Sequence, residues 1–171
     1  GAIIGFGFIA AEGHLVALKQ RRDLEIVAVF DQNPDRQAVA ERLLPRARFY
    51  TSVGALFESE TLDFVDIATS PASHIDYMRM AISRNLHVLC EKPLVLREDH
   101  LADISNYINS GSKTVYTVHN WKFAPIFLKT SELIQSGQIG LIKHVRYEVL
   151  RTGPSVAVSS GNNSVNWRLR P

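Results

Sequence analysis

The sequence has few of the features that mark disulfide-rich, membrane or nucleic-acid-binding proteins. It contains one cysteine, Cys90, among 171 residues, which excludes an internal disulfide and fits a reducing compartment. No apolar run approaches the roughly 20 residues that span a bilayer, and no signal-like segment is present. The formal net charge is only +2, and no block of Lys and Arg alternates with aromatic residues. With 46% hydrophobic residues, the chain is predicted to be a cytoplasmic α/β protein without a nucleic-acid or membrane partner.

The first ten residues combine a short apolar run with a glycine-rich turn. Residues 2–4 have the composition of a buried strand, and Gly5-Phe-Gly-Phe-Ile-Ala10 follows with the spacing G-x-G-x-x-A. A helix is expected over residues 8–20, so the order is strand, glycine turn and helix. This order suits a dinucleotide pyrophosphate, because glycines permit close backbone approach and a helix N-terminus attracts anions. Taken alone, the motif fits an ordinary tight turn equally well. The candidate cofactor-binding residues here are Gly5, Phe6, Gly7, Phe8 and Ile9.

A carboxylate follows the second apolar run. Residues 25–30 are nearly all apolar or β-branched, as in a strand buried on both faces of a parallel sheet, and Asp31 comes next. A carboxylate about 20 residues beyond the glycine turn can accept hydrogen bonds from ribose hydroxyls and repel a 2′-phosphate. We therefore expect NAD, although nearby Arg36 leaves NADP possible. Residues 31–34 also suit an Asx turn before the next helix, and the two roles are compatible.

Strand-like and helix-like segments alternate up to residue 118, which predicts right-handed crossovers and a doubly wound parallel sheet of the Rossmann type. This first domain is expected to span residues 1–118 and to bind NAD(P). Further strands are expected at 46–50, 63–68, 86–90 and 113–118, and further helices at 34–44, 53–57, 73–84 and 97–109.

The last fifty residues follow a different pattern. A helix is expected over 124–136 and a strand over 141–150, whereas 151–171 is rich in Gly, Ser, Asn and Pro. One helix, one strand and a loop cannot close a core. We interpret 119–171 as the beginning of an incomplete α+β substrate and oligomerisation domain.

Several motifs occur together in one order along the chain. Beyond the glycine turn and Asp31 they are Thr69-Ser-Pro-Ala-Ser-His74, Cys90-Glu-Lys-Pro93, His119-Asn-Trp-Lys-Phe-Ala-Pro125 and Ser136-Gly-Gln-Ile-Gly-Leu-Ile142. Together they resemble the glucose–fructose oxidoreductase, inositol dehydrogenase and MocA (Gfo/Idh/MocA) family over essentially the whole chain. The resemblance implies an NAD(P)-dependent dehydrogenase acting on a secondary hydroxyl of a sugar, cyclitol or related polyol. It also implies a dimer or tetramer when the protein is full length.

The resemblance also assigns roles to particular residues. Lys92 is expected near the substrate hydroxyl as the catalytic residue, and the Lys92–Pro93 bond is often cis in this family. Members usually carry an Asp-x-x-x-His beyond a Trp-Arg-x-x-Pro stretch, but here Trp167-Arg168-Leu-Arg-Pro171 ends the sequence. The chain is therefore expected to bind cofactor more surely than to catalyse. The cofactor-binding residues implied by the family are Thr69, Ser70, Pro71, His74, Glu91, Lys92 and Asn120.

Alternatives to these roles remain open. A lysine at a strand end can hydrogen-bond a substrate oxygen and, when desolvated, release its proton more readily, with Glu91 orienting it or contacting the ribose. The same pair could be a surface ion pair before a turn. His14, His87, His100 and His144 have no metal-site spacing and are predicted to be ordinary surface or packing residues. The rival functions are a catalytically silent dinucleotide-binding sensor or scaffold and a Rossmann-like protein without cofactor.

Overall fold

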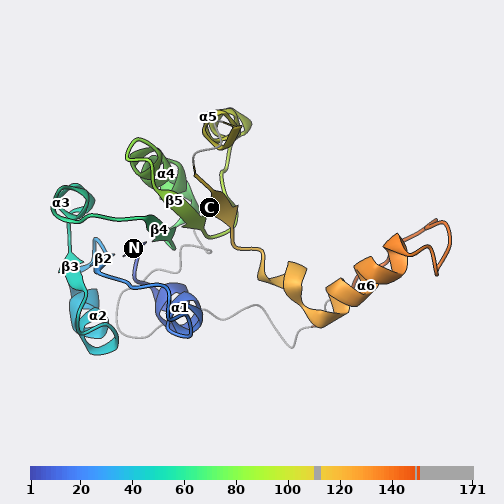
Figure 1. The fold of residues 1–171 in the computed structure, drawn as a ribbon, viewed down its shortest axis with the longest axis horizontal. Coiled ribbons are helices and arrows are strands. Elements are labelled where there is room, and N and C mark those ends of the chain that lie inside the picture. Colours follow the sequence, from blue (N-terminus) through green and yellow to red (C-terminus); the bar gives the residue numbers. More distant parts are fainter. Residues whose placement is uncertain (110–112, 149, 151–171) are drawn as a thin grey trace. The chain divides into compact units, whose positions relative to one another are not determined.

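The chain forms two compact units, Gly1–His119 and Asn120–Pro171. The computed structural model describes residues 1–109, 113–148 and 150, and Figure 1 shows their secondary structure. Within these residues, no helix has the length and apolar character needed to cross a bilayer.

The first unit is built on a six-stranded sheet with the order β3-β2-β1-β4-β5-β6. Every neighbouring pair is parallel. The order reverses between β1 and β4, which is the switch point at which doubly wound sheets bind ligands. The predicted Rossmann sheet is therefore confirmed. The strands are β1 (Ala2–Ile4), β2 (Ala28–Phe30), β3 (Arg48–Tyr50), β4 (Phe64–Ile67), β5 (His87–Cys90) and β6 (Val115–Thr117).

Helices cover both faces of this sheet (Figure 1). The first helix starts at Phe8 and includes a π-helical turn, Ala10–His14, before α1. Pro34 opens the turn before α2, and Ser52 caps α3 by accepting a hydrogen bond from the Ala55 N–H at 3.3 Å. The helices are α1 (Leu15–Leu18), α2 (Gln37–Leu43), α3 (Val53–Ser59), α4 (His74–Ile82) and α5 (Glu98–Asn109).

The core has two layers because neighbouring side chains of a strand point to opposite faces. Ile4 joins the layer that contains Leu56 of α3 and Met78 of α4. Ile3 joins the other layer, which contains Leu15 of α1 and Ala40 of α2. Burial on both faces explains why the central strands are apolar at nearly every position.

Gly5 directly follows β1 in a conformation that favours glycine, with φ at +90°. A Cβ at this position would lie 2.6 Å from the Thr69 Cγ2 atom and 3.1 Å from the Ala68 backbone. A Cβ on Gly7, in contrast, would meet no atom within 4 Å. The two glycines of the motif thus differ: Gly5 is required by the packing of β1 against the end of β4, and Gly7 faces open space.

The second unit begins with a 3₁₀ turn, Asn120–Phe123, and continues as α6 (Pro125–Gln135). The strand predicted over 141–150 is wrong for the described residues, since 141–148 contain no strand. A strand needs a neighbour for its backbone N–H and C=O groups, and a β-rich composition cannot supply one. Residues 151–171 lie outside the described residues, and so does the Trp167-Arg168 stretch. That this unit opens a substrate domain remains a prediction.

The difference between the two glycines predicts different effects on stability. Gly5→Ala is expected to lower the free energy of unfolding by about 1–3 kcal/mol, because it combines a strained backbone with a steric clash. Gly7→Ala, the matched control, is expected to stay within about 0.5 kcal/mol of the unmodified chain. Chemical denaturation followed by circular dichroism measures both. Equal losses for the two variants would contradict this account of the turn.

Candidate active site

The residues that follow the parallel strands lie along one edge of the sheet. Ile4 pairs with Phe30 on one side and with Ile67 on the other, and Ile67 pairs with Cys90. Gly5, Asp31, the 68–71 loop and Glu91 therefore follow their strands at the same level. The sheet register gathers most of the residues predicted from the sequence on either side of the switch point.

Asp31 is held in place by the glycine turn. Its Oδ2 atom accepts a hydrogen bond from the backbone N–H of Phe6 at 2.7 Å, and its Oδ1 atom accepts one from the N–H of Asn33 at 2.9 Å. The second contact is the expected Asx turn. The Phe6 side chain is fully buried in the core, whereas Phe8 and Ile9 are 65% and 45% exposed. The turn thus fixes the carboxylate through its backbone and leaves apolar side chains at its surface.

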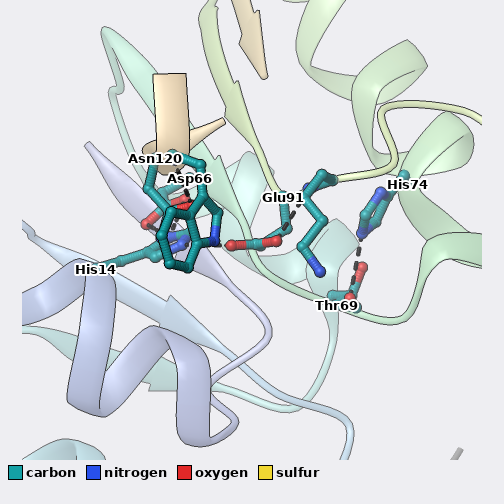
Figure 2. Close-up of polar contacts among 8 residues, drawn as sticks. His14, Asp66, Thr69, His74, Glu91 and Asn120 are labelled. Carbon is teal, nitrogen blue, oxygen red and sulfur yellow. Dashed lines mark hydrogen bonds and ion pairs between the residues drawn. The ribbon is translucent and has the colours of Figure 1, made fainter. Parts of the chain in front are cut away.

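His74 connects two loops at this edge, and Figure 2 shows its contact with Thr69. Its Nε2 atom lies 3.1 Å from the carbonyl oxygen of Thr69, and its Nδ1 atom lies 2.9 Å from that of Pro93. The ring is completely buried, so its two nitrogens face the backbone carbonyl oxygens of these loops and not solvent. The Lys92–Pro93 bond is cis, as expected. His74 therefore sets the distance between the Thr69 loop and the turn that carries Lys92.

His14 lies between two carboxylates, which the sequence did not predict (Figure 2). Its Nδ1 atom is 2.9 Å from both carboxylate oxygens of Asp66, and its Nε2 atom is 3.1 Å from Glu91 Oε1. The side chains of His14, Asp66 and Glu91 are 9%, 0% and 13% exposed. The interpretation of His14 as an ordinary surface or packing residue is wrong. We call these three residues the His14 cluster.

Electrostatics favour the protonated form of His14. Burial alone would lower the pKa of its ring, but the hydrogen bonds and negative charges of Asp66 and Glu91 outweigh burial and raise that pKa above 6.5. The carboxylates lie on opposite ring nitrogens, so they do not converge on one point as metal ligands do. In the described part of the chain no group of three or more His, Cys, Asp or Glu side chains could hold a metal ion.

Cys90 lies beside this cluster and is chemically quiet. Its side chain is completely buried. Burial, together with the charges of Asp66 and Glu91, raises the pKa of its thiol to about 12. The thiol therefore stays protonated and is not a nucleophile.

Lys92 follows Glu91 and is exposed. Its backbone N–H donates to Glu91 Oε2 at 3.0 Å, while its ammonium has no polar partner among the described residues. Within the first unit the Lys92 ammonium therefore remains exposed to water and is not desolvated. Asn120 opens the second unit, where its side-chain oxygen accepts a hydrogen bond from the Trp121 N–H at 3.0 Å. Its participation in a site with Lys92 stays a prediction.

Comparison with known proteins agrees with the Rossmann fold of the first unit. The Gfo/Idh/MocA family model, described as an oxidoreductase family with an NAD-binding Rossmann fold, matches residues 1–119. The chain belongs to this family.

Individual family members show the same relationship. D-apiose dehydrogenase of Paraburkholderia graminis is 32% identical over 143 residues, which cover 82% of this chain and 37% of that protein. D-xylose 1-dehydrogenase (NADP(+)) 2 of Haloferax volcanii is 32% identical over 146 residues, 82% of this chain and 44% of that protein. An oxidoreductase from Agrobacterium radiobacter, solved with NAD⁺, L-tartaric acid and magnesium, has a TM-score of 0.75 at 27% identity. The match covers 82% of this chain and 41% of that chain.

This chain spans about half the length, or less, of the curated Gfo/Idh/MocA relatives that it matches, from 37% to 52% for three of them. The family model covers the first unit and all the cofactor-binding residues predicted from the sequence except Asn120.

One residue of the His14 cluster could have been found from the sequence. Asp66 stands inside an otherwise apolar strand, and a carboxylate buried there requires a partner. The identity of the partner was not visible, because His14 lies 52 residues earlier in the chain.

The raised pKa of His14 predicts a pH-dependent contribution to stability. The folded-state pKa exceeds the unfolded value, so protonated His14 stabilises fully below about pH 6.5, and this contribution is lost as the pH rises through the folded-state pKa. His14→Gln is expected to cost about 3 kcal/mol near pH 6.5, because it leaves two carboxylates without their cation, and less at pH 9.

Urea denaturation between pH 6.5 and pH 9 measures this difference. His87→Gln is the control, because the His87 Nδ1 atom accepts a hydrogen bond from the Thr114 N–H at 3.1 Å and the ring forms no ion pair with the described residues. Its cost is expected not to fall with rising pH. A cost for His14→Gln that is equally independent of pH would contradict the ion-pair description.

Proposed function

We propose that this chain is the cofactor-binding part of an NAD(P)-dependent dehydrogenase that acts on a secondary hydroxyl of a sugar, cyclitol or related polyol. Its single cysteine fits a reducing, cytoplasmic location. As the family resemblance implies, the full-length protein forms a dimer or tetramer.

The observation that carries the proposal is the fixed carboxylate of Asp31. Hydrogen bonds from Phe6 and Asn33 hold both of its oxygens next to the glycine turn, and each oxygen keeps a lone pair for a further donor. Ribose hydroxyls are donors of this kind, whereas a 2′-phosphate would meet a negative charge. This arrangement favours NAD over NADP. Half-buried Arg36 is the residue that could offset the repulsion of a phosphate.

The surface beside Asp31 suits the pyrophosphate. A Cβ added to Gly7 would meet no atom, so there is room for a ligand at the backbone of this residue. The helix that starts at Phe8 directs its first N–H groups toward the same end of β1, where an anion is stabilised by the helix dipole. Phe8 and Ile9 offer exposed apolar surface to the cofactor.

At the reactive end, the residues orient the substrate and move a proton. The bound dinucleotide supplies hydride exchange at its nicotinamide. Lys92 donates a hydrogen bond to the substrate hydroxyl and takes part in transferring its proton. Glu91 binds His14 and the backbone of Lys92, so it orients this lysine through the main chain and does not pair with the ammonium. Thr69, Ser70 and Pro71 form the loop along the cofactor, positioned by His74.

Titration with NADH and NADPH, followed by fluorescence, tests cofactor binding. We expect NADH to bind at least about tenfold more tightly, a difference of about 1.4 kcal/mol. Asp31→Ser is expected to weaken NADH binding and to narrow this preference, while Lys19→Met, a change of an exposed lysine away from the strand ends, leaves both affinities unchanged. Failure to bind either dinucleotide would refute the proposal, and tighter NADPH binding would reverse the expected preference.

Replacement of Lys92 separates the enzyme from the silent binding module. Lys92→Met is expected to reduce the turnover of the whole protein by about 100-fold or more, as for the loss of a general acid–base group. The NADH dissociation constant is expected to stay within about twofold, because the ammonium acts on substrate. An activity assay over a panel of aldoses and cyclitols measures the turnover, and the fluorescence titration measures the NADH dissociation constant. Lys19→Met is the matched lysine control in both experiments. Equal turnover for Lys92→Met and the unmodified protein would remove Lys92 from the mechanism.

A further inference from the structure

The His14 cluster has more acceptors than a neutral histidine can satisfy. Ionised carboxylates only accept hydrogen bonds, and a neutral imidazole donates only one. In the structure, both ring nitrogens of His14 face carboxylate oxygens, Asp66 at 2.9 Å and Glu91 at 3.1 Å. Two donated bonds require the imidazolium form. Protonation also reduces the charge of the three groups from −2 to −1 in a place with little access to water.

Glu91 extends this contact to the turn that carries Lys92. While Oε1 of Glu91 faces His14, its Oε2 atom accepts the backbone N–H of Lys92 at 3.0 Å. The backbone of Glu91 is fixed as well, because its N–H donates to the carbonyl oxygen of Ile67 at 2.8 Å. A short path of hydrogen bonds therefore runs from the helix after the glycine turn to the backbone of Lys92.

We propose that His14 is an imidazolium that holds Glu91 and thereby positions the backbone of Lys92. Asp66 keeps the proton on the ring from the side of β4, and Glu91 receives the second hydrogen bond at the end of β5. His14 is a positioning residue, since it acts on Lys92 through Glu91. The consequence for catalysis rests on the proposed function, whereas the protonation of His14 and its effect on Lys92 do not.

The charged surroundings of His14 set the direction of the pH dependence. Among the described residues of the first unit, Asp66 of β4 and Glu91 after β5 face the ring, and the Cys90 thiol nearby remains neutral. Glu12 lies on the same helical turn and is exposed. When rising pH removes the ring proton, Glu91 loses its donor and the Lys92 turn loses its support. Below that pH the turn keeps one conformation.

A titration of the isotope-labelled chain without cofactor tests this inference. Nuclear magnetic resonance follows the ring nitrogens of His14 and the backbone amide of Lys92 between pH 5.5 and 9.5. We expect both to change with one midpoint above 6.5. In Glu91→Gln the His14 midpoint is expected to fall and the Lys92 amide to stop following it, while His87→Gln leaves both unchanged. A His14 midpoint at or below 6.5, or a Lys92 amide that does not follow His14, would overturn the proposal even if no variant folds.

The affinity for NADH over the same pH range shows whether the protonation of His14 affects cofactor binding. In the unmodified chain the NADH dissociation constant is expected to rise several-fold across the His14 midpoint, because the backbone of the 91–93 turn loses its support, whereas Lys92→Met removes only the ammonium and leaves this backbone in place. In His14→Gln the affinity for NADH is expected to be low and independent of pH. Binding without this dependence would overturn the link to the site. Absence of NADH binding at every pH would refute the proposed function, and the titration of His14 and the Lys92 amide would still decide the positioning role.

Discussion

The parallel pairing of β1 with β2 on one side and with β4 on the other determines where the functional side chains of the first unit lie. Because paired strands end at the same level, Gly5, Asp31 and Thr69 emerge together, and Glu91 follows at the end of the adjacent β5. The strand order also reverses between β1 and β4, and doubly wound sheets bind their ligands at such a switch point. Gly5 is part of this constraint, since a larger residue would push β1 away from Ala68 and Thr69.

A second constraint is the buried carboxylate of Asp66. It points into the layer beneath α1, because its partner across the ladder, Ile3, packs there. A carboxylate in that layer without a hydrogen-bond donor would be strongly destabilising. His14 provides the donor from the first helix, and its second nitrogen is then directed toward Glu91. The requirement to pair one buried charge thus brings a residue of the β5 end into contact with the helix that follows the glycine turn.

These two constraints explain how far the sequence could be interpreted. Gly5, Asp31 and the strand ends were predictable because each depends on a local pattern, a glycine spacing or an apolar run that ends in a polar residue. The contacts of His14 were not, because they join residues 52 and 77 positions apart and depend on the strand order. The prediction of a strand at 141–150 was wrong because it relied on the local pattern alone. The local composition of this segment is suitable, but a strand also requires a partner, which composition does not specify.

The first helix also connects the glycine turn to the turn that carries Lys92. Gly7 and the N–H groups at Phe8 belong to the same helix as His14, so the element suited to the pyrophosphate also carries the donor for Asp66 and Glu91. His74 forms a similar bridge from the Thr69 loop to Pro93, on the other side of the Lys92 turn. The backbone turn that carries Lys92 is therefore held between two histidines, His14 on the first helix and His74 on α4, and these helices pack on opposite faces of the sheet. The Lys92 side chain is exposed, whereas the backbone that carries it is held on both sides by these contacts.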